Sequence, residues 1–131
     1  MKLTPYLLLD GSCKQAMQFY HSVLGGELNI IAVKDSPARD HMPASLQDRI
    51  LNAKLTNGDL SISASDWLRP DQTPQHGNLV CLYLSGNATD LKRLFDRLSE
   101  GAEVTDPLKQ HYGGQYGALN DKFGVRWMFH E

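Results

Sequence analysis

The sequence lacks the features of nucleic-acid-binding, membrane and secreted proteins. Its 131 residues carry 13 lysines and arginines against 15 aspartates and glutamates, so no basic surface for a phosphate backbone is expected. No apolar run approaches the roughly 18 residues of a transmembrane helix. The first apolar run is also too short for a signal peptide. We therefore expect a soluble, cytoplasmic protein that binds neither nucleic acid nor membrane.

Cysteine is scarce, and the common catalytic motifs are missing. Cys13 and Cys81 are far apart and follow no metal or redox spacing, so we expect two free, mostly buried thiols in a reducing compartment. The patterns GxSxG, HExxH, P-loop and GxGxxG are absent. The chain is about the size of one domain with one core.

Apolar periodicity predicts a strand, a helix and three further strands in the first half. Ser12 is a plausible N-cap for a helix whose apolar residues recur at spacings of three and four, and Gly25-Gly26 ends it. Asn57-Gly58 is a strong hairpin signal. The predicted elements are strands over 4–9, 27–34, 49–56 and 59–65, a helix over 13–24 and an aperiodic loop over 35–48.

The same order starts again after a linker over residues 67–77. The predicted elements there are strands over 78–85, 102–106, 114–119 and 125–130, and a helix with Leu91, Leu94, Phe95 and Leu98 on one face. The two halves align at an offset of 75 positions, which places Gly11 on Gly86 and Gly26 on Gly101. An internal repeat of this kind predicts one α+β domain made of two βαβββ modules, residues 1–66 and 78–131.

Three segments carry a resemblance to a known family: PYLLLDGSCKQAMQFYHSVLGGEL, GDLSISASD and DKFGVRWMFHE. They resemble the PhnB-like branch of the vicinal-oxygen-chelate superfamily, which includes glyoxalases, bleomycin-resistance proteins and dihydroxybiphenyl dioxygenases. The resemblance covers nearly the whole chain and is weakest over residues 35–48. It implies that each βαβββ module forms half of an open, cup-shaped mixed sheet around a small-molecule cavity, which a homodimer often completes.

In metal-dependent members of this superfamily, four side chains on four strands hold a divalent cation. The resemblance places these positions at Pro5, about Ile62, Val80 and Met128. Proline, isoleucine and valine have no donor atom, and methionine sulfur suits soft ions. The neighbouring positions also lack histidine and carboxylate; they are Thr4, Tyr6, Ser61, Ser63, Leu79, Cys81, Trp127 and Phe129.

The histidines do not supply an alternative metal site, because their spacing fits no ligand pair; they are His21, His41, His76, His111 and His130. We expect no metal and no cofactor. Parts of the branch are called ubiquinone-pathway methyltransferases, but this sequence has no glycine-rich strand–helix turn to hold S-adenosylmethionine.

Eight residues are candidates for binding a small organic ligand, because they combine rings with a few polar groups. They are Asn52, Lys54, Asp66, Trp67, His111, Tyr112, Tyr116 and Arg126. Asn52 and Lys54 alternate with Ala53 and share one face of a strand. Arg126 should face the cup together with Met128 and would favour an anionic ligand.

Structural roles remain open for several of these candidates. Asp66 could cap a turn, and Trp67 could pack in the core or a dimer contact. Tyr112 and Tyr116 could equally pack. Arg126 could pair with a carboxylate of a second subunit.

The sequence therefore predicts a metal-free, homodimeric small-molecule-binding protein of the glyoxalase/bleomycin-resistance type. One alternative is a lyase, isomerase or dioxygenase with a relocated site around Asn52, Asp66, His111 and Tyr112. A second alternative is a protein-interaction module that uses the concave sheet. The sequence does not identify the ligand.

Overall fold

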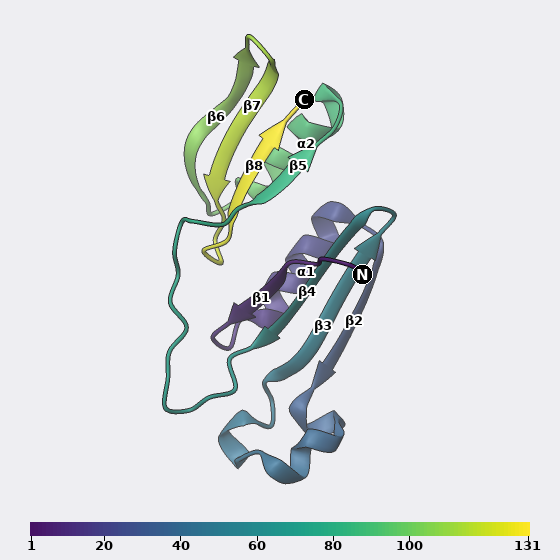
Figure 1. Cartoon of the computed structure of the whole chain (residues 1–131), viewed down its shortest axis with the longest axis vertical. Coiled ribbons are helices and arrows are strands. Elements are labelled where there is room, and N and C mark those ends of the chain that lie inside the picture. The colour runs from purple at the N-terminus through teal and green to yellow at the C-terminus, as the bar shows by residue number, and fades with distance from the viewer. The chain divides into compact units, whose positions relative to one another are not determined.

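A computed structural model describes residues 1–131, and the chain divides into two compact units. The first unit is Met1–Gln75 and the second is His76–Glu131. Each unit has one four-stranded sheet and one α-helix, so the predicted α+β class and the repeated βαβββ order are confirmed (Figure 1). Neither helix has the length and apolar character needed to cross a membrane.

The first unit is a mixed sheet in the order β1-β4-β3-β2. Its elements are β1 (Tyr6–Leu9), α1 (Cys13–Leu24), β2 (Glu27–Ala32), β3 (Ile50–Asn57) and β4 (Leu60–Asp66). β1 is parallel to β4, and the other neighbours are antiparallel. The last strand of the unit therefore lies inside its sheet, between the first and third strands.

Helix α1 covers one face of this sheet and leaves the other face open. Its buried stripe consists of Cys13, Ala16, Met17, Tyr20, Val23 and Leu24. The helix contacts β2, β3 and β4, whose buried side chains include Ala53, Leu55, Ile62 and Ala64. Because side chains alternate along a strand, the residues between these point to the opposite side, called here the open face of the first sheet.

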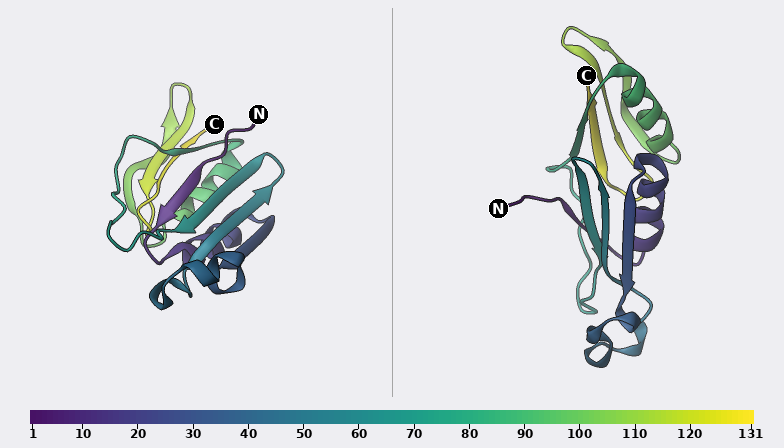
Figure 2. Two further views of the ribbon diagram at one scale, coloured as in Figure 1. Left: turned by 60° about the horizontal axis from the view of Figure 1, so that its bottom comes forward. Right: turned by 90° about the vertical axis from the view of Figure 1, so that its right-hand side faces the viewer.

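The second unit repeats this arrangement in the order β5-β8-β7-β6. Its elements are β5 (Leu82–Ser85), α2 (Ala88–Leu98), β6 (Glu103–His111), β7 (Gly114–Asn120) and β8 (Arg126–His130). β5 is parallel to β8, which again is the last strand in the chain and lies inside the sheet. Figure 2 shows each sheet with its own helix on one face.

The core of the second unit lies between α2 and its sheet. Phe95 of the helix meets Phe129 of β8 edge to face, with ring centroids 5.0 Å apart. Gly117 of β7 allows this close packing, because an added Cβ would lie 2.9 Å from the Phe95 ring and from the Leu108 backbone. Trp127 and Leu119 are also fully buried.

Two strands of the second unit begin or end at other residues than the sequence predicts. The apolar run from residue 78 predicted an early start, but β5 begins only at Leu82, and Leu79 and Val80 are exposed. β6 is longer than predicted and extends to His111, with register irregularities along it. His111 therefore ends a strand rather than lying in a loop.

The first unit also differs locally from the sequence prediction. β2 ends at Ala32, two residues before the end of the strand predicted over 27–34, and a short 3₁₀ turn follows at Val33–Asp35. The segment predicted as an aperiodic loop over 35–48 contains two more, Pro37–His41 and Ala44–Leu46. Asn57 pairs with Leu60, so the hairpin turn is formed by Gly58 and Asp59 rather than by Asn57 and Gly58. Asn57 instead donates a side-chain hydrogen bond to the Leu24 carbonyl at the end of α1.

Candidate functional site

Polar side chains occupy the middle of the open face of the first sheet. Asn52 and Lys54 of β3 both lie there and are exposed, as their alternation predicted. The register pairs Ser63 of β4 with Tyr6 on one side and Lys54 on the other. The Asn52 Nδ2 atom lies 3.5 Å from the Tyr6 hydroxyl, to which it donates. This face offers hydrogen bonds and one positive charge, and its amide cannot act as a base near neutral pH.

Serines continue this polar surface along β4. Ser61, Ser63 and Ser65 alternate with Ile62 and Ala64, which face α1. The Ser61 hydroxyl is buried and has no hydrogen-bond partner. The open face of the first sheet is therefore polar along both interior strands, β4 and β3.

Asp66 is buried, and its carboxylate is bonded to the backbone of the first unit. Its side chain is 2% exposed. Oδ1 accepts hydrogen bonds from the backbone N–H groups of Gly11 at 2.9 Å and Cys13 at 3.0 Å, and Oδ2 accepts one from Ile50 at 2.8 Å. Both carboxylate oxygens are thus engaged by backbone groups that begin α1 and β3, which matches the capping role left open for Asp66 in the sequence.

The same contacts correct the predicted helix cap. Ser12 makes no side-chain hydrogen bond to α1, and Asp66 accepts the bond from the first residue of the helix in its place. Burial, reinforced by the Asp66 charge, raises the pKa of the Cys13 thiol to about 12. Cys13 is therefore a protonated, inert thiol at neutral pH.

Trp67 lines a pocket of about 370 Å³ at the end of β4. The other lining residues are Leu8, Ser65, Asp66, Leu68 and Arg69. The Arg69 guanidinium lies 5.9 Å from the centre of the Trp67 ring. The indole nitrogen of Trp67 is buried and has no hydrogen-bond partner. This pocket brings together two of the sequence candidates, Asp66 and Trp67.

A second pocket, of about 300 Å³, gathers rings at the β6–β7 hairpin of the second unit. It is lined by His111, Tyr112, Gly113, Tyr116 and His130, and is called here the ring pocket. His111 and Tyr116 meet edge to face with centroids 5.7 Å apart. His130 also stacks on Tyr83, with centroids 6.4 Å apart.

The ring pocket unites three sequence candidates and adds one further ring. His111, Tyr112 and Tyr116 were predicted from the glycine-rich segment, whereas His130 was not. The register pairs Tyr116 with His130 across β7 and β8, a contact that the repeat alignment does not reveal. Two imidazoles and two phenols suit a planar ligand that can accept or donate hydrogen bonds.

Arg126 lies on the face of the second sheet opposite the buried Trp127, together with Met128, as predicted. Its guanidinium donates to Thr105 Oγ1 and Asn120 Oδ1, both at 3.2 Å. It also lies 3.9 Å from an Asp106 carboxylate oxygen. Asp106 of the same chain is therefore one carboxylate neighbour of Arg126.

The four positions assigned to metal ligands do not share the open faces. Ile62 is 6% exposed and faces α1, and Val80 is 77% exposed and precedes β5. Pro5 precedes β1, and Met128 alone lies on an open face within a strand. The chain has no group of three or more histidine, cysteine, aspartate or glutamate side chains that could hold a metal ion. The residues at these positions do not fit the divalent cation of the metal-dependent members.

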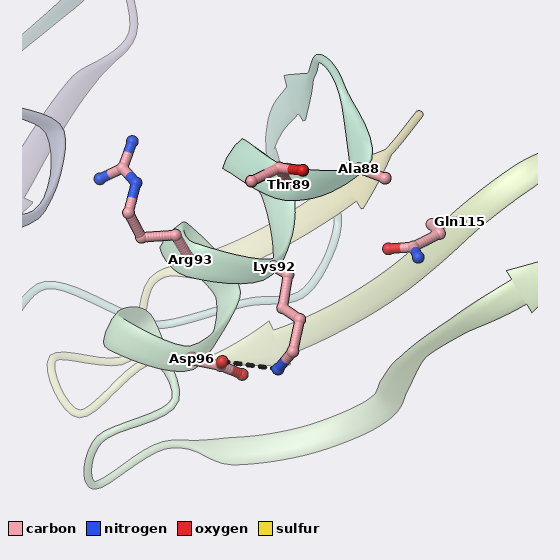
Figure 3. A pocket seen from close by; sticks show the side chains of 6 residues that line it. All are labelled: Ala88, Thr89, Lys92, Arg93, Asp96 and Gln115. Carbon is pink, nitrogen blue, oxygen red and sulfur yellow. Dashed lines mark hydrogen bonds and ion pairs between the residues drawn. The ribbon is translucent and has the colours of Figure 1, made fainter.

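Sequence reasoning missed a depression of about 550 Å³ beside α2, lined by Ala88, Thr89, Lys92, Arg93, Asp96 and Gln115. Figure 3 shows Lys92 and Asp96 pointing toward one another and Gln115 on the neighbouring strand. Lys92 pairs with Asp96 at 2.8 Å and Arg93 with Asp90 at 3.6 Å, so its cations are balanced within the helix. The only sequence signal is the polar side of an amphipathic helix, which solvated helices also have.

Comparison with known proteins places the chain among related sequences over its full length. Residues 1–129 match the family described as 3-demethylubiquinone-9 3-methyltransferase. Protein YjdN of Escherichia coli is 27% identical, over 98% of this chain and 93% of that protein.

Solved structures give the same result. Protein PA1353 from Pseudomonas aeruginosa is 32% identical with a TM-score of 0.89, covering 99% of this chain and 96% of that one. The PhnB protein from Bacillus cereus is 20% identical with a TM-score of 0.76, covering 99% and 98% of the two chains, and supports the fold.

Proposed function

The chain belongs to the family described as 3-demethylubiquinone-9 3-methyltransferase, in the PhnB-like branch of the vicinal-oxygen-chelate superfamily. On this premise we propose that it is a small-molecule-binding protein of the glyoxalase/bleomycin-resistance type that works without the usual metal site. Its ligand is a small, planar organic molecule. The family name describes methyl transfer, but the chain has no glycine-rich strand–helix turn for a methyl donor.

The ring pocket is the observation that carries this proposal. Its four ring-bearing residues come from β6, β7, β8 and the hairpin between them, and three of them were candidates from the sequence alone. Stacking and edge contacts with a planar ligand need no metal. A volume of about 300 Å³ is at the lower end of ordinary small-molecule sites.

The enzyme alternative has less support from the contacts of its candidate residues. Asp66 has both oxygens bonded to backbone N–H groups, and Asn52 is no general base. These two residues also differ in exposure, since Asn52 is exposed and Asp66 is buried. Binding through rings and hydrogen bonds is therefore the function that the side chains favour.

We also propose that the protein forms a homodimer and resides in the cytoplasm. Apolar side chains on the open face of the first sheet, Tyr6, Leu8 and Ile31, are each nearly half exposed. Tyr6 and Leu8 lie together on edge strand β1, whereas Ile31 lies on the opposite edge strand, β2. An exposed apolar edge such as that of β1 favours association with a partner surface. Cys13 and Cys81 are both free, which suits a reducing compartment. Sedimentation that detects only monomer at micromolar concentration would contradict the dimer.

Elemental analysis and ligand binding together test the function. We expect no stoichiometric metal in the purified protein and no change in melting temperature on addition of zinc, nickel or manganese. Tight, stoichiometric zinc, nickel or iron would overturn the metal-free proposal.

Indole serves as a neutral, planar probe of the ring pocket. Saturation-transfer NMR should detect indole binding to the native protein, and Tyr116→Leu should weaken it because a ring that lines the pocket is lost. Tyr6→Leu, on the first sheet, is the matched control and should leave it unchanged. Equal binding by both variants and the native protein would refute the ring pocket as the site.

A further inference from the structure

The pocket at the end of β4 is lined by Trp67, whose indole N–H group has no acceptor in the chain. The Trp67 Nε1 atom has less than 1 Å² of exposed area and no acceptor. A buried, unpaired N–H group costs roughly 1–3 kcal/mol, so such a group in a native structure calls for an explanation. Trp127 offers a contrast, because its Nε1 donates to Asp121 Oδ2 at 2.9 Å.

The Trp67 backbone is held firmly on both sides. Its N–H donates to the Leu9 carbonyl, and its carbonyl accepts from the Arg49 guanidinium at 2.8 Å. The first of these bonds continues the pairing of β1 with β4, so Trp67 follows the alternation that places Leu8 and Ser65 on the open face. The indole is therefore presented from a fixed backbone.

A positive charge without a carboxylate partner lies next to this donor. Arg69 takes part in no ion pair of the chain, and its guanidinium lies 5.9 Å from the Trp67 ring centre. Arg49, the other nearby cation, already pairs with Asp10 at 2.8 Å. The Asp66 carboxylate also lines the pocket, but three backbone N–H groups offset its charge.

The remaining walls of the pocket define the body of an occupant. Leu8 and Leu68 are apolar, and Ser65 contributes a hydroxyl group. A volume of about 370 Å³ accommodates a small organic molecule but not a macromolecule. The pocket thus combines an apolar wall, one orphan N–H donor and one unpaired guanidinium.

We propose that this pocket binds the carboxylate of a small organic acid, with Trp67 Nε1 donating to one carboxylate oxygen and Arg69 neutralising the charge. The Trp67 Nε1 atom is covered in the free protein, so the proposal requires the exposed Arg69 side chain, which lies over the indole ring, to move aside when the anion enters. This site is separate from the ring pocket and does not depend on it. It belongs to the first unit, whereas the ring pocket belongs to the second.

Indole N–H resonances provide a direct test, because the chain has two tryptophans. In a ¹⁵N-labelled full-length protein, benzoate should shift the Trp67 indole N–H resonance downfield and leave that of Trp127 unchanged. Benzamide, which has the same shape without the charge, should bind at least about tenfold more weakly. Inorganic phosphate is the third probe and should compete poorly with the planar carboxylate.

Two variants separate the donor from the charge. Trp67→Phe keeps a ring but removes the N–H group, and should weaken benzoate about tenfold, as followed by the backbone amides of residues 65–69. Arg69→Gln should weaken it by roughly fivefold. Arg93→Gln, which removes an exposed cation of α2, is the control and should leave the affinity unchanged. The backbone amides of α1 report that the first unit of each variant is folded, and the Trp127 resonance does so for the second unit.

Each outcome decides for or against the proposal. The proposal is supported if benzoate shifts the Trp67 indole N–H resonance and if this binding is weakened both with benzamide and in Arg69→Gln. Equal binding of benzamide, stronger binding of phosphate, or no benzoate shift up to the solubility limit would each overturn it. None of these results changes indole binding by the ring pocket, so the two proposals fail independently.

Discussion

Replacing Asp66 by asparagine would test the role of this residue in joining three elements of the first unit. The native carboxylate accepts three backbone hydrogen bonds, from Gly11, Cys13 and Ile50. Asparagine has nearly the same size but only one acceptor oxygen, and its amide group is a donor. In either orientation, the Asp66→Asn variant places an N–H donor against at least one backbone N–H.

The expected magnitude follows from these contacts. In the less costly orientation the amide oxygen keeps the bonds to Gly11 and Cys13, and only the bond to Ile50 is lost. A hydrogen bond to a charged acceptor contributes about 1.5–3 kcal/mol, and the unpaired buried donors add to this loss. We expect the free energy of unfolding to fall by about 3 kcal/mol, a large share of the roughly 5–15 kcal/mol typical of a domain.

Urea unfolding followed by tryptophan fluorescence measures this change. Asp48→Asn is the matched control, because Asp48 is exposed and contacts only Lys34 through its side chain, and we expect no measurable change. A loss below about 1 kcal/mol for Asp66→Asn would refute the structural role of the carboxylate.

Local geometry leads to four further predictions. Burial and the Asp66 charge raise the pKa of Cys13 from 9.0 to about 12, so iodoacetamide at pH 8 should label Cys81 but not Cys13 in the folded protein. Because the folded pKa is the higher one, the stabilisation from Cys13 is complete below pH 9 and lost as the pH rises toward about 12, and Cys13→Ala should flatten alkaline unfolding curves over this window. Gly26→Ala should lower the free energy of unfolding by about 2 kcal/mol or more in urea titrations, since its φ is +87° and an added Cβ would collide with a β3 carbonyl oxygen. Asn87→Ala should cost about 1 kcal/mol by the same measurement, since Asn87 caps α2 through the Asp90 N–H.

The order of elements could be predicted from the sequence because it depends on local signals. The spacing of Ala16, Met17 and Tyr20 predicts the buried stripe of α1, and all three are fully buried. Glycine ends this helix as expected, with Gly25 at its C-cap. The offset that aligns Gly11 with Gly86 likewise reproduces the start of α2 at Ala88, since α1 starts at Cys13.

Features that depend on long-range contacts could not be predicted in this way. The acceptor for the first N–H of α1 comes from Asp66, 53 residues away, so Ser12 was the only candidate visible locally. Leu79 and Val80 look like strand residues, but β5 pairs with β8 only from Leu82 onward. Their apolar character carries no information about the length of the partner strand.

The candidate site was predicted in pieces for the same reason. His111, Tyr112 and Tyr116 are close in sequence and line one pocket, whereas His130 joins them only through the pairing of β7 with β8. Asp66 and Trp67 are adjacent in sequence, yet one is tied to the backbone and the other has an unpaired indole nitrogen. Residue type alone does not distinguish these roles, because the hydrogen-bond partners are set by the fold.

Because of the strand order in each unit, the loss of one strand damages its sheet more than the loss of another. In both sheets the strand that comes first in the sequence lies at an edge, and the strand that comes last lies between two others. Proteolytic loss of β1 would strip one margin from its sheet and leave three paired strands. Loss of β8 would instead split the second sheet, since β5 pairs with no other strand. A fusion tag or a protease acting next to β8 therefore endangers the second unit more than the same event next to β1 endangers the first.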